Sequence, residues 1–142
     1  GLGGLGSNVA FALARLGVGH LHLIDFDRVD LTNLNRQQYL LRHVGMYKTD
    51  ALKEQLLQIN PYLDITTDCV KVTSENLKTL FEDADIICEA FDNKSDVCQR
   101  HTGMFSPEKT GLCFRHGRLW QQQHHPYPKD WQQFLSLWRR NH

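Results

Sequence analysis

The sequence predicts an α/β fold with a doubly wound, mostly parallel sheet. Segments with the spacing of strands alternate along the chain with segments of helical spacing. A glycine-rich turn comes directly before the first helical segment. Acidic residues follow two of the apolar segments, and ligands of α/β sheets bind at that edge. These three observations together favour a nucleotide-binding type of sheet.

The first helix and the first strand follow the glycine-rich turn. Ser7 and Asn8 are side chains that can cap a helix, and the apolar face that follows ends before Gly17. Residues 20–24 alternate between polar and apolar side chains and then become apolar, which is typical of a strand. The acidic segment 25–27 follows this strand. Two carboxylates are therefore expected at the C-terminal end of this strand.

The remaining elements continue the alternation. Residues 31–45, named here the polar loop, have no clean period and predict a loop with a short helical turn. Residues 48–59 have helical spacing and end before a proline. Residues 63–72 alternate as a strand, and a further helix is expected from Ser74. The apolar run 85–90 is typical of a central parallel strand. Because the chain opens inside a glycine motif that normally follows a buried strand, we expect it to lack the first strand of the sheet.

Charge and composition exclude several classes of protein. The 142 residues carry no net charge, which argues against a nucleic-acid or membrane-surface partner held by bulk electrostatics. No apolar run approaches the roughly 20 residues that span a bilayer. The four cysteines include no C-x-x-C pair, so we expect reduced thiols, no zinc site and a cytoplasmic location.

The last third of the chain differs in composition from the rest. Residues 1–94 carry nine basic and thirteen acidic side chains, whereas residues 95–142 carry seven and three. All three tryptophans and five of the eight histidines lie in the second segment. We therefore expect a folded core over 1–94 and an atypical tail over 95–142, either frameshifted or disordered, with the C-terminal strands of the sheet missing. A genuine aromatic, basic appendage is the alternative, and resequencing the coding DNA separates the two.

The glycine-rich turn, residues 1–6 and named here the glycine loop, predicts a phosphate site. Glycines allow backbone N–H groups to approach a phosphate at the start of a helix, where the helix dipole favours negative charge. Gly1, Gly3, Gly4 and Gly6 are the candidates. Asp25 follows at the separation from which a carboxylate binds a ribose hydroxyl. The alternative is a plain glycine turn beside a solvated carboxylate, and these residues alone suit NAD as well as ATP.

Three polar side chains further along favour a triphosphate over a dinucleotide. Asn33, Arg36 and Lys48 lie beyond the point where an oxidoreductase needs them, and three phosphates require compensating cations. Lys48 opens a helix, where a lysine opposes the dipole unless an anion lies beside it. Each of these residues taken singly also fits an ordinary surface position.

Several motifs together resemble the ubiquitin-activating superfamily, the group that includes ThiF, MoeB and the adenylation half of E1 enzymes. The run Asn-Leu-Asn-Arg-Gln-Gln-Tyr looks most like ThiF-family proteins of thiamine biosynthesis. The resemblance covers residues 1 to about 94. The motifs, in chain order, are Gly1-Leu-Gly-Gly-Leu-Gly-Ser7, Gly17-Val-Gly-His-Leu21, Asp25-Phe-Asp27, Asn33-Leu-Asn-Arg-Gln-Gln38, Val44-Gly-Met-Tyr-Lys48, Ile59-Asn-Pro61 and Asp92-Asn93.

The resemblance implies a role for each matching residue. The glycine loop would lie along the phosphates of ATP, Asp25 would hold the ribose, and the three polar side chains Asn33, Arg36 and Lys48 would contact the triphosphate. Asp92 would hold Mg²⁺ with assistance from Asp27, since this ion prefers one or two carboxylates and phosphate oxygens. Catalysis is expected to depend on Arg36, Lys48 and Asp92.

The resemblance also implies a reaction and partners. The chain would be a nucleotidyltransferase that adenylates the C-terminal glycine of a small ubiquitin-like sulfur carrier, similar to ThiS, and the full-length family forms homodimers. An E1-like enzyme acting on another carboxylate, on a MoaD-like carrier or on tRNA, is the alternative. An NAD-linked oxidoreductase and an inactive remnant are further alternatives.

Overall fold

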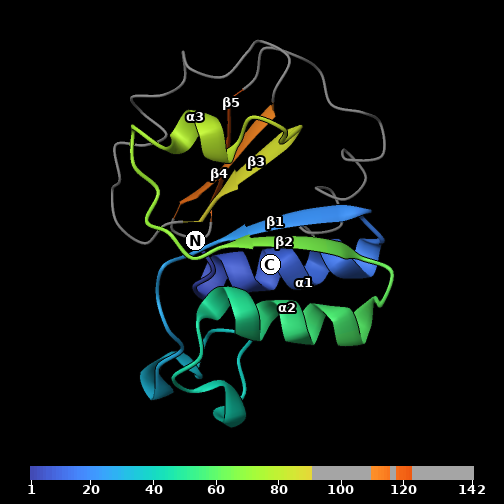
Figure 1. The fold of residues 1–142 in the computed structure, drawn as a ribbon, viewed down its shortest axis with the longest axis vertical. Helices are drawn as coiled ribbons and strands as arrows, with labels where there is room; N and C mark the ends of the chain where they lie inside the picture. The colour runs from blue at the N-terminus through green and yellow to red at the C-terminus, as the bar shows by residue number, and fades with distance from the viewer. Residues whose placement is uncertain (91–109, 116–117, 123–142) are drawn as a thin grey trace.

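The computed structural model describes residues 1–90, 110–115 and 118–122, the last two ranges by their backbone (Figure 1). No helix within these ranges has the length and apolar character needed to cross a bilayer. In chain order the elements are α1 (Gly4–Leu16), β1 (His20–Ile24), the 3₁₀ turns η1 (Leu31–Asn33) and η2 (Leu41–His43), α2 (Lys48–Ile59), β2 (Asp64–Asp68), α3 (Leu77–Leu80), β3 (Ile86–Glu89), β4 (Thr110–Arg115) and β5 (Arg118–Gln122).

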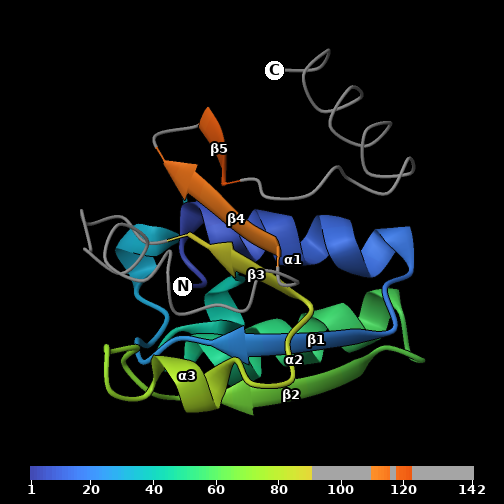
Figure 2. The same ribbon diagram turned by 90° about the horizontal axis from the view of Figure 1, so that it is seen from above.

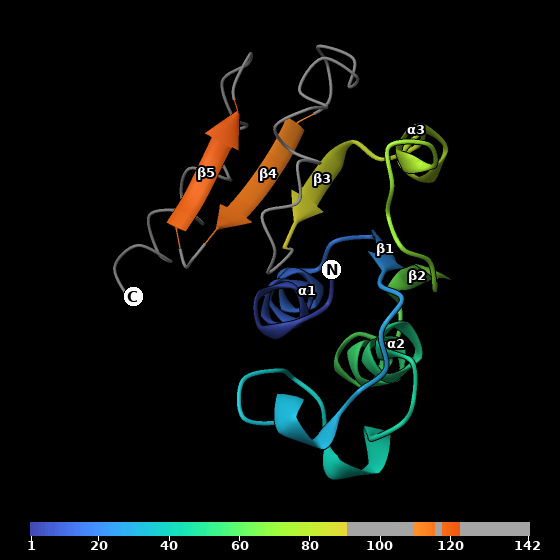
Figure 3. The ribbon, with the colours of Figure 1, turned by 90° about the vertical axis from the view of Figure 1, so that its left-hand side faces the viewer.

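The strand pairing confirms an α/β fold with mostly parallel strands. β1 pairs with β2 in parallel, from His20 opposite Asp64 to Ile24 opposite Asp68. β3 pairs in parallel with β4, and β5 joins β4 in the antiparallel direction. Helices α1 and α2 lie on one side of the β1–β2 pair and α3 lies on the other (Figure 3). Helices on both faces are typical of a parallel sheet whose strands are joined through helices.

The strands form two sheets instead of the single sheet that the sequence predicts. One sheet has the order β1–β2 and the other β3–β4–β5. The N-terminal end of the chain lies between β1 and β3, as Figures 1 and 3 show. In a doubly wound sheet this is the place of the strand that leads into the glycine loop. Within the described ranges no strand joins the two sheets.

The expectation that the C-terminal strands are missing was wrong for residues 110–115 and 118–122. β4 contains the apolar run Leu112-Cys-Phe114, which is short enough for its strand pattern to be lost among the charged, Gln- and His-rich residues around it. β4 pairs with β3 across the boundary that we predicted near residue 94 (Figure 2). Whether the tail arises from a frameshift or is a genuine appendage stays a prediction. The prediction that the tail is disordered concerns, apart from β4 and β5, residues outside the described ranges.

Helix α1 begins earlier than the capping residues indicate. Its N-cap is Gly3, so Ser7 and Asn8 lie inside the helix and do not cap it. The Ser7 hydroxyl instead donates to the carbonyl of Gly3, 2.7 Å away, the back-bonding that serine favours within a helix. The predicted end was right: Gly17 has φ +79°, and its N–H bonds to the carbonyl of Ala14. Strands β1, β2 and β3 and helix α2 lie within the predicted segments, while α3 is a single turn.

One hydrophobic core holds α1 and α2 against the β1–β2 pair. The small side chains Ala10 and Ala14 of α1 permit close approach to α2, which contributes Leu52 and Leu56. Both leucines are fully buried. The core therefore fixes the start of α1 and the start of α2 relative to the end of β1. The other buried members are Leu2, Leu23, Val29, Tyr39, Ala51, Leu63 and Ile65.

Truncating Leu52 tests how far this core determines the stability of the fold. We expect Leu52→Ala to lower the free energy of unfolding by about 2–5 kcal/mol, because the side chain is lost and the cavity collapses only in part. The Leu41→Ala variant is the control, since Leu41 is 70% exposed. Urea denaturation followed by circular dichroism measures both variants. Equal midpoints for the two would contradict this assignment of the core.

Candidate functional site

The glycine loop passes into helix α1 with its backbone held closely. A Cβ on Gly6 would overlap the carbonyl oxygen of Gly1 and come within 3.3 Å of the Cβ of Ala90. Only glycine therefore fits at position 6. No side chain caps the Gly3 end of α1, so the N–H groups of its first turn keep their capacity to bind an anion.

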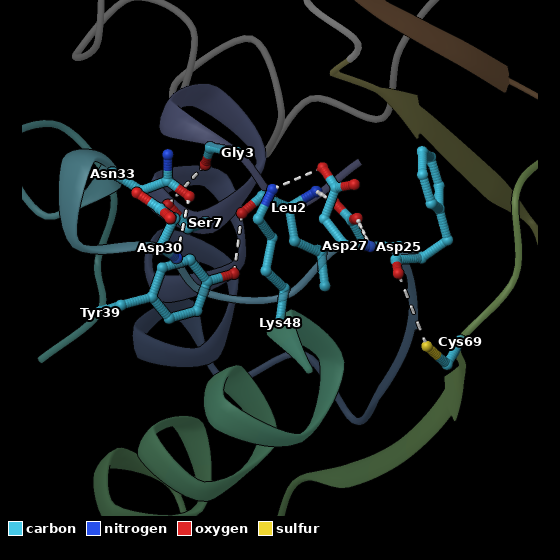
Figure 4. A network of polar contacts seen from close by, with 11 residues as sticks. Leu2, Gly3, Ser7, Asp25, Asp27, Asp30, Asn33, Tyr39, Lys48 and Cys69 are labelled. Carbon is cyan, nitrogen blue, oxygen red and sulfur yellow. Dashed lines mark hydrogen bonds and ion pairs between the residues drawn. The ribbon is translucent and has the colours of Figure 1, made fainter. Parts of the chain in front are cut away.

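Asp25 lies at the end of β1 with both carboxylate oxygens bonded to the backbone. The N–H of Leu2 donates to Oδ2 at 2.6 Å, and the N–H of Asp27 donates to Oδ1 at 2.8 Å (Figure 4). The residue is 8% exposed. Each oxygen has a second lone pair, so the carboxylate can accept a further bond from a ligand hydroxyl. The structure thus joins the glycine loop and Asp25, the two parts of the predicted nucleotide site.

Lys48 and Asp27 form an ion pair beside this carboxylate. The Lys48 Nζ lies 2.9 Å from the Asp27 Oδ2, and the backbone N–H of Lys48 donates to the carbonyl of Asp27 at 3.0 Å. Lys48 is 6% exposed, whereas the Asp27 side chain is 49% exposed. The pair explains how a buried lysine is tolerated at the first position of α2, where the helix dipole disfavours it. It also holds one cationic group at the carboxyl end of β1.

Arg36 lies over the first turn of α1. The position that a Cβ on Gly4 would take is 3.4 Å from the Arg36 Cγ. The guanidinium donates to the carbonyl of Thr32 at 3.2 Å and to the Oδ1 of Asn35 at 3.1 Å. These are exposed contacts, so the group can exchange them for a phosphate without leaving a buried donor unpaired.

Asn33, the third predicted phosphate contact, has a local structural role here. Its Oδ1 accepts from the N–H of Asp30 at 3.3 Å, while the Asp30 carboxylate accepts from the N–H of Thr32 at 2.8 Å. These contacts cap η1. The bonds to Thr32 keep the pKa of Asp30 below its usual value. The side chain of Asn33 therefore shapes the polar loop that carries Arg36.

Sequence reasoning missed three hydrogen bonds that join the polar loop to the glycine loop and to helix α1. The Ser7 hydroxyl accepts from the N–H of Gln38 at 3.2 Å. The Gln38 side chain donates to the side chain of Asn8. The Tyr39 hydroxyl donates to the carbonyl of Leu2 at 2.8 Å (Figure 4). The one signal in the sequence was a tyrosine at the end of a polar run, since the hydroxyl of a tyrosine usually has a partner when the side chain is buried.

The described residues do not by themselves form a magnesium site. Asp92, the predicted ligand, lies outside the described residues. Asp25 accepts two backbone bonds and Asp27 is paired with Lys48. Across the described ranges no group of three or more His, Cys, Asp or Glu side chains is placed to hold a metal.

A protein-family model described as "ThiF family" matches residues 1–101, more than half of the chain. The chain belongs to the ThiF family. The resemblance inferred from the glycine loop and the later motifs is thus confirmed, and so is the Rossmann-like α/β fold that it implies.

Three ThiF-type relatives illustrate the similarity. The chain is 40% identical over 97 residues to the adenylyltransferase and sulfurtransferase MOCS3 of Culex quinquefasciatus, covering 66% of this chain and 22% of that protein. It is 33% identical over 146 residues to the molybdopterin-synthase adenylyltransferase of Haemophilus influenzae, covering 99% and 60%. The structure of the Escherichia coli tRNA N6-threonylcarbamoyladenosine dehydratase TcdA in complex with ATP matches with a TM-score of 0.66 and 37% identity, covering 71% and 45%.

These relatives bear on the expected substrate. The chain spans between 22% and 60% of the length of the three proteins. One is named for molybdopterin synthase and another for a tRNA, and none of the three names refers to thiamine. One of them holds ATP. The nucleotide expectation thus has support from a relative, whereas the ThiS carrier stays a prediction.

Proposed function

We propose that this chain is the nucleotide-binding part of an ATP-dependent adenylyltransferase that activates the C-terminal carboxylate of a small ubiquitin-like carrier. The observation that carries the proposal is the meeting of the glycine loop, Asp25 and the Lys48–Asp27 pair, with Arg36 over the first turn of α1. This arrangement presents N–H donors, a ribose acceptor and two cations around one helix N-terminus. The adenylyltransferase names of two relatives add support.

The proposed chemistry needs no nucleophile from the protein. A carboxylate oxygen of the carrier attacks the α-phosphorus of ATP, the bond from that phosphorus to the bridging oxygen breaks, and pyrophosphate leaves with its electron pair. Asp25 holds the ribose, while the N–H groups at the start of α1 bind phosphate oxygens. Lys48 and Arg36 neutralise the charge that grows on the phosphates. The rate then depends on alignment and preformed electrostatics.

Magnesium is part of this proposal, since an ATP triphosphate is usually bound with the ion. Asp92 is its proposed ligand, with Asp27 as a second proposed carboxylate.

The identity of the carrier protein is a more specific part of the proposal. A ThiS-like carrier follows from the motif resemblance, whereas the molybdopterin-synthase relative favours a MoaD-like carrier. A second candidate function, activation of a carboxylate attached to tRNA, is favoured by the 37% identity to the tRNA dehydratase structure. All three substrates offer the same attacking group, so the nucleotide site described above serves each of them.

Exchange of labelled pyrophosphate into ATP tests the function and separates these substrates. We expect exchange from the full-length protein only when a carrier with a free C-terminal glycine is added, and a ThiS-like and a MoaD-like carrier are compared directly. Exchange that needs threonylcarbamoyladenosine-containing tRNA instead would support the second candidate. A carrier lacking its last glycine is the control. If no substrate supports ATP–pyrophosphate exchange, both candidate functions are excluded and an inactive remnant is favoured.

A further inference from the structure

Tyr39 is a buried tyrosine that no step of the proposed reaction uses. It ends the run of polar residues that starts at Asn33, yet it is 4% exposed and belongs to the hydrophobic core. Its hydroxyl donates to the carbonyl of Leu2 at 2.8 Å. A core tyrosine is thus bonded to the middle of the glycine loop, 37 positions earlier in the chain.

Leu2 connects this tyrosine to the predicted ribose carboxylate. While its carbonyl accepts from Tyr39, its N–H donates to Asp25 at 2.6 Å (Figure 4). The peptide groups on both sides of one residue are therefore held by side chains from two other segments. Glycine-rich backbone samples many conformations when nothing holds it. The bonds at Leu2 are the means by which the flanking glycines keep one conformation.

The backbone beside Tyr39 is itself fixed. The N–H of Gln38 donates to the Ser7 hydroxyl at 3.2 Å, and the Gln38 carbonyl accepts from the side chain of Gln55 at 2.6 Å. Gln55 belongs to α2, whose buried leucines form the core. The backbone next to Tyr39 is thus held by two hydrogen bonds, which limits the movement of the tyrosine hydroxyl.

The hydroxyl also stays a donor. Burial and the nearby charge of Asp25 raise the pKa of Tyr39 well above its usual value. The phenol is therefore protonated throughout the physiological range, and the Leu2 carbonyl keeps its partner.

We propose that Tyr39 is a positioning residue for the nucleotide. Its hydrogen bond to the Leu2 carbonyl holds Leu2, whose N–H bonds to Asp25, and so sets the orientation of the Asp25 carboxylate and the path of the glycine loop. This role rests on the proposed binding of ATP. Tyr39 acts only through Leu2 and is not placed in contact with the nucleotide. Its hydroxyl is expected to affect affinity and ribose discrimination more than the chemical step.

The Tyr39→Phe variant tests the role, because it removes the hydroxyl and keeps the ring in the core. Isothermal titration of the full-length protein gives the Kd for ATP and for 2′-deoxy-ATP. Loss of one buried hydrogen bond is expected to raise the Kd for ATP about fivefold. The preference for ATP over 2′-deoxy-ATP is expected to shrink as well, because Asp25 loses its fixed orientation. The control is Tyr62→Phe, the same chemical change at a residue that is 94% exposed, and it should alter neither value.

Two further measurements separate positioning from simple stability. Thermal unfolding reports the loss of stability, and amide hydrogen exchange over residues 2–7, compared with residues 51–56 of α2, reports whether the glycine loop alone loosens. A lower Tm with unchanged Kd and unchanged ribose preference would overturn the role of Tyr39 and leave the proposed function intact. Failure of the wild-type protein to bind ATP would overturn both.

Discussion

A Lys48→Met variant is expected to lose about 100-fold or more of the rate of ATP–pyrophosphate exchange, as removal of one preformed donor does in other enzymes. Lys48 is buried beside the exposed carboxylate of Asp27, and it is the cation held at the carboxyl end of β1. Methionine keeps the apolar stem and removes only the charge. The effect should therefore fall on kcat/KM for ATP and not on folding.

The stability of the Lys48→Met variant provides the first control. Its partner Asp27 has a side chain that is 49% exposed, so water solvates the carboxylate once the lysine is gone. We expect little change in the Tm. The matched substitution Lys78→Met, at an exposed lysine of α3, should leave exchange at the wild-type rate. Exchange by Lys48→Met within threefold of the wild type would contradict the placement of Lys48 at the phosphates.

The second large effect is expected at Gly6. An alanine there would overlap the carbonyl oxygen of Gly1, and backbone atoms offer no flexible side chain that can move aside. The glycine loop must shift, and a displacement of about 1 Å at an aligning group can cost on the order of 100-fold in rate. We expect Gly6→Ala to weaken ATP binding and to reduce exchange by at least that factor. Fluorescence titration with a labelled ATP analogue measures the first effect.

Gly19 supplies the matched control for this substitution. A Cβ at Gly19 would meet nothing within 4 Å, and its backbone does not have a positive φ. Gly19→Ala should therefore bind ATP as the wild type does and unfold at the same temperature or slightly higher. Normal ATP binding by Gly6→Ala would show that the loop adapts freely, and it would remove the close approach at position 6 as a requirement of the site.

Local patterns in the sequence were enough to predict most of the described elements. The helical period over residues 48–59 and the proline after it predicted α2, and the alternation over residues 20–24 predicted β1. These elements form because their periodicity matches the faces that they bury. The start of α1 was predicted too late, since a serine suited to capping also bonds back to the preceding turn inside a helix.

The contacts among the candidate residues join segments that lie far apart in the chain. Motif spacing predicts one site for the glycine loop, Asp25, Arg36 and Lys48. The structure brings the segments that carry them into contact, and their binding roles stay predictions. Asn33 was expected at the triphosphate, but its side chain caps η1. A short polar side chain in a turn has local backbone partners available, and the sequence does not show which partner it takes.

The sequence by itself determined which residue types are available to the proposed nucleotide site: glycines before a helix, a carboxylate after a strand and a lysine at the start of the next helix. These are local properties of residue type and period. Only the tertiary structure decided how they are held, because a hydrogen bond between distant residues depends on where the core places their segments. The hydrogen bond between Tyr39 and Leu2 joins residues 37 positions apart, and the one between Leu2 and Asp25 joins residues 23 positions apart. No periodic pattern in the sequence predicts such contacts.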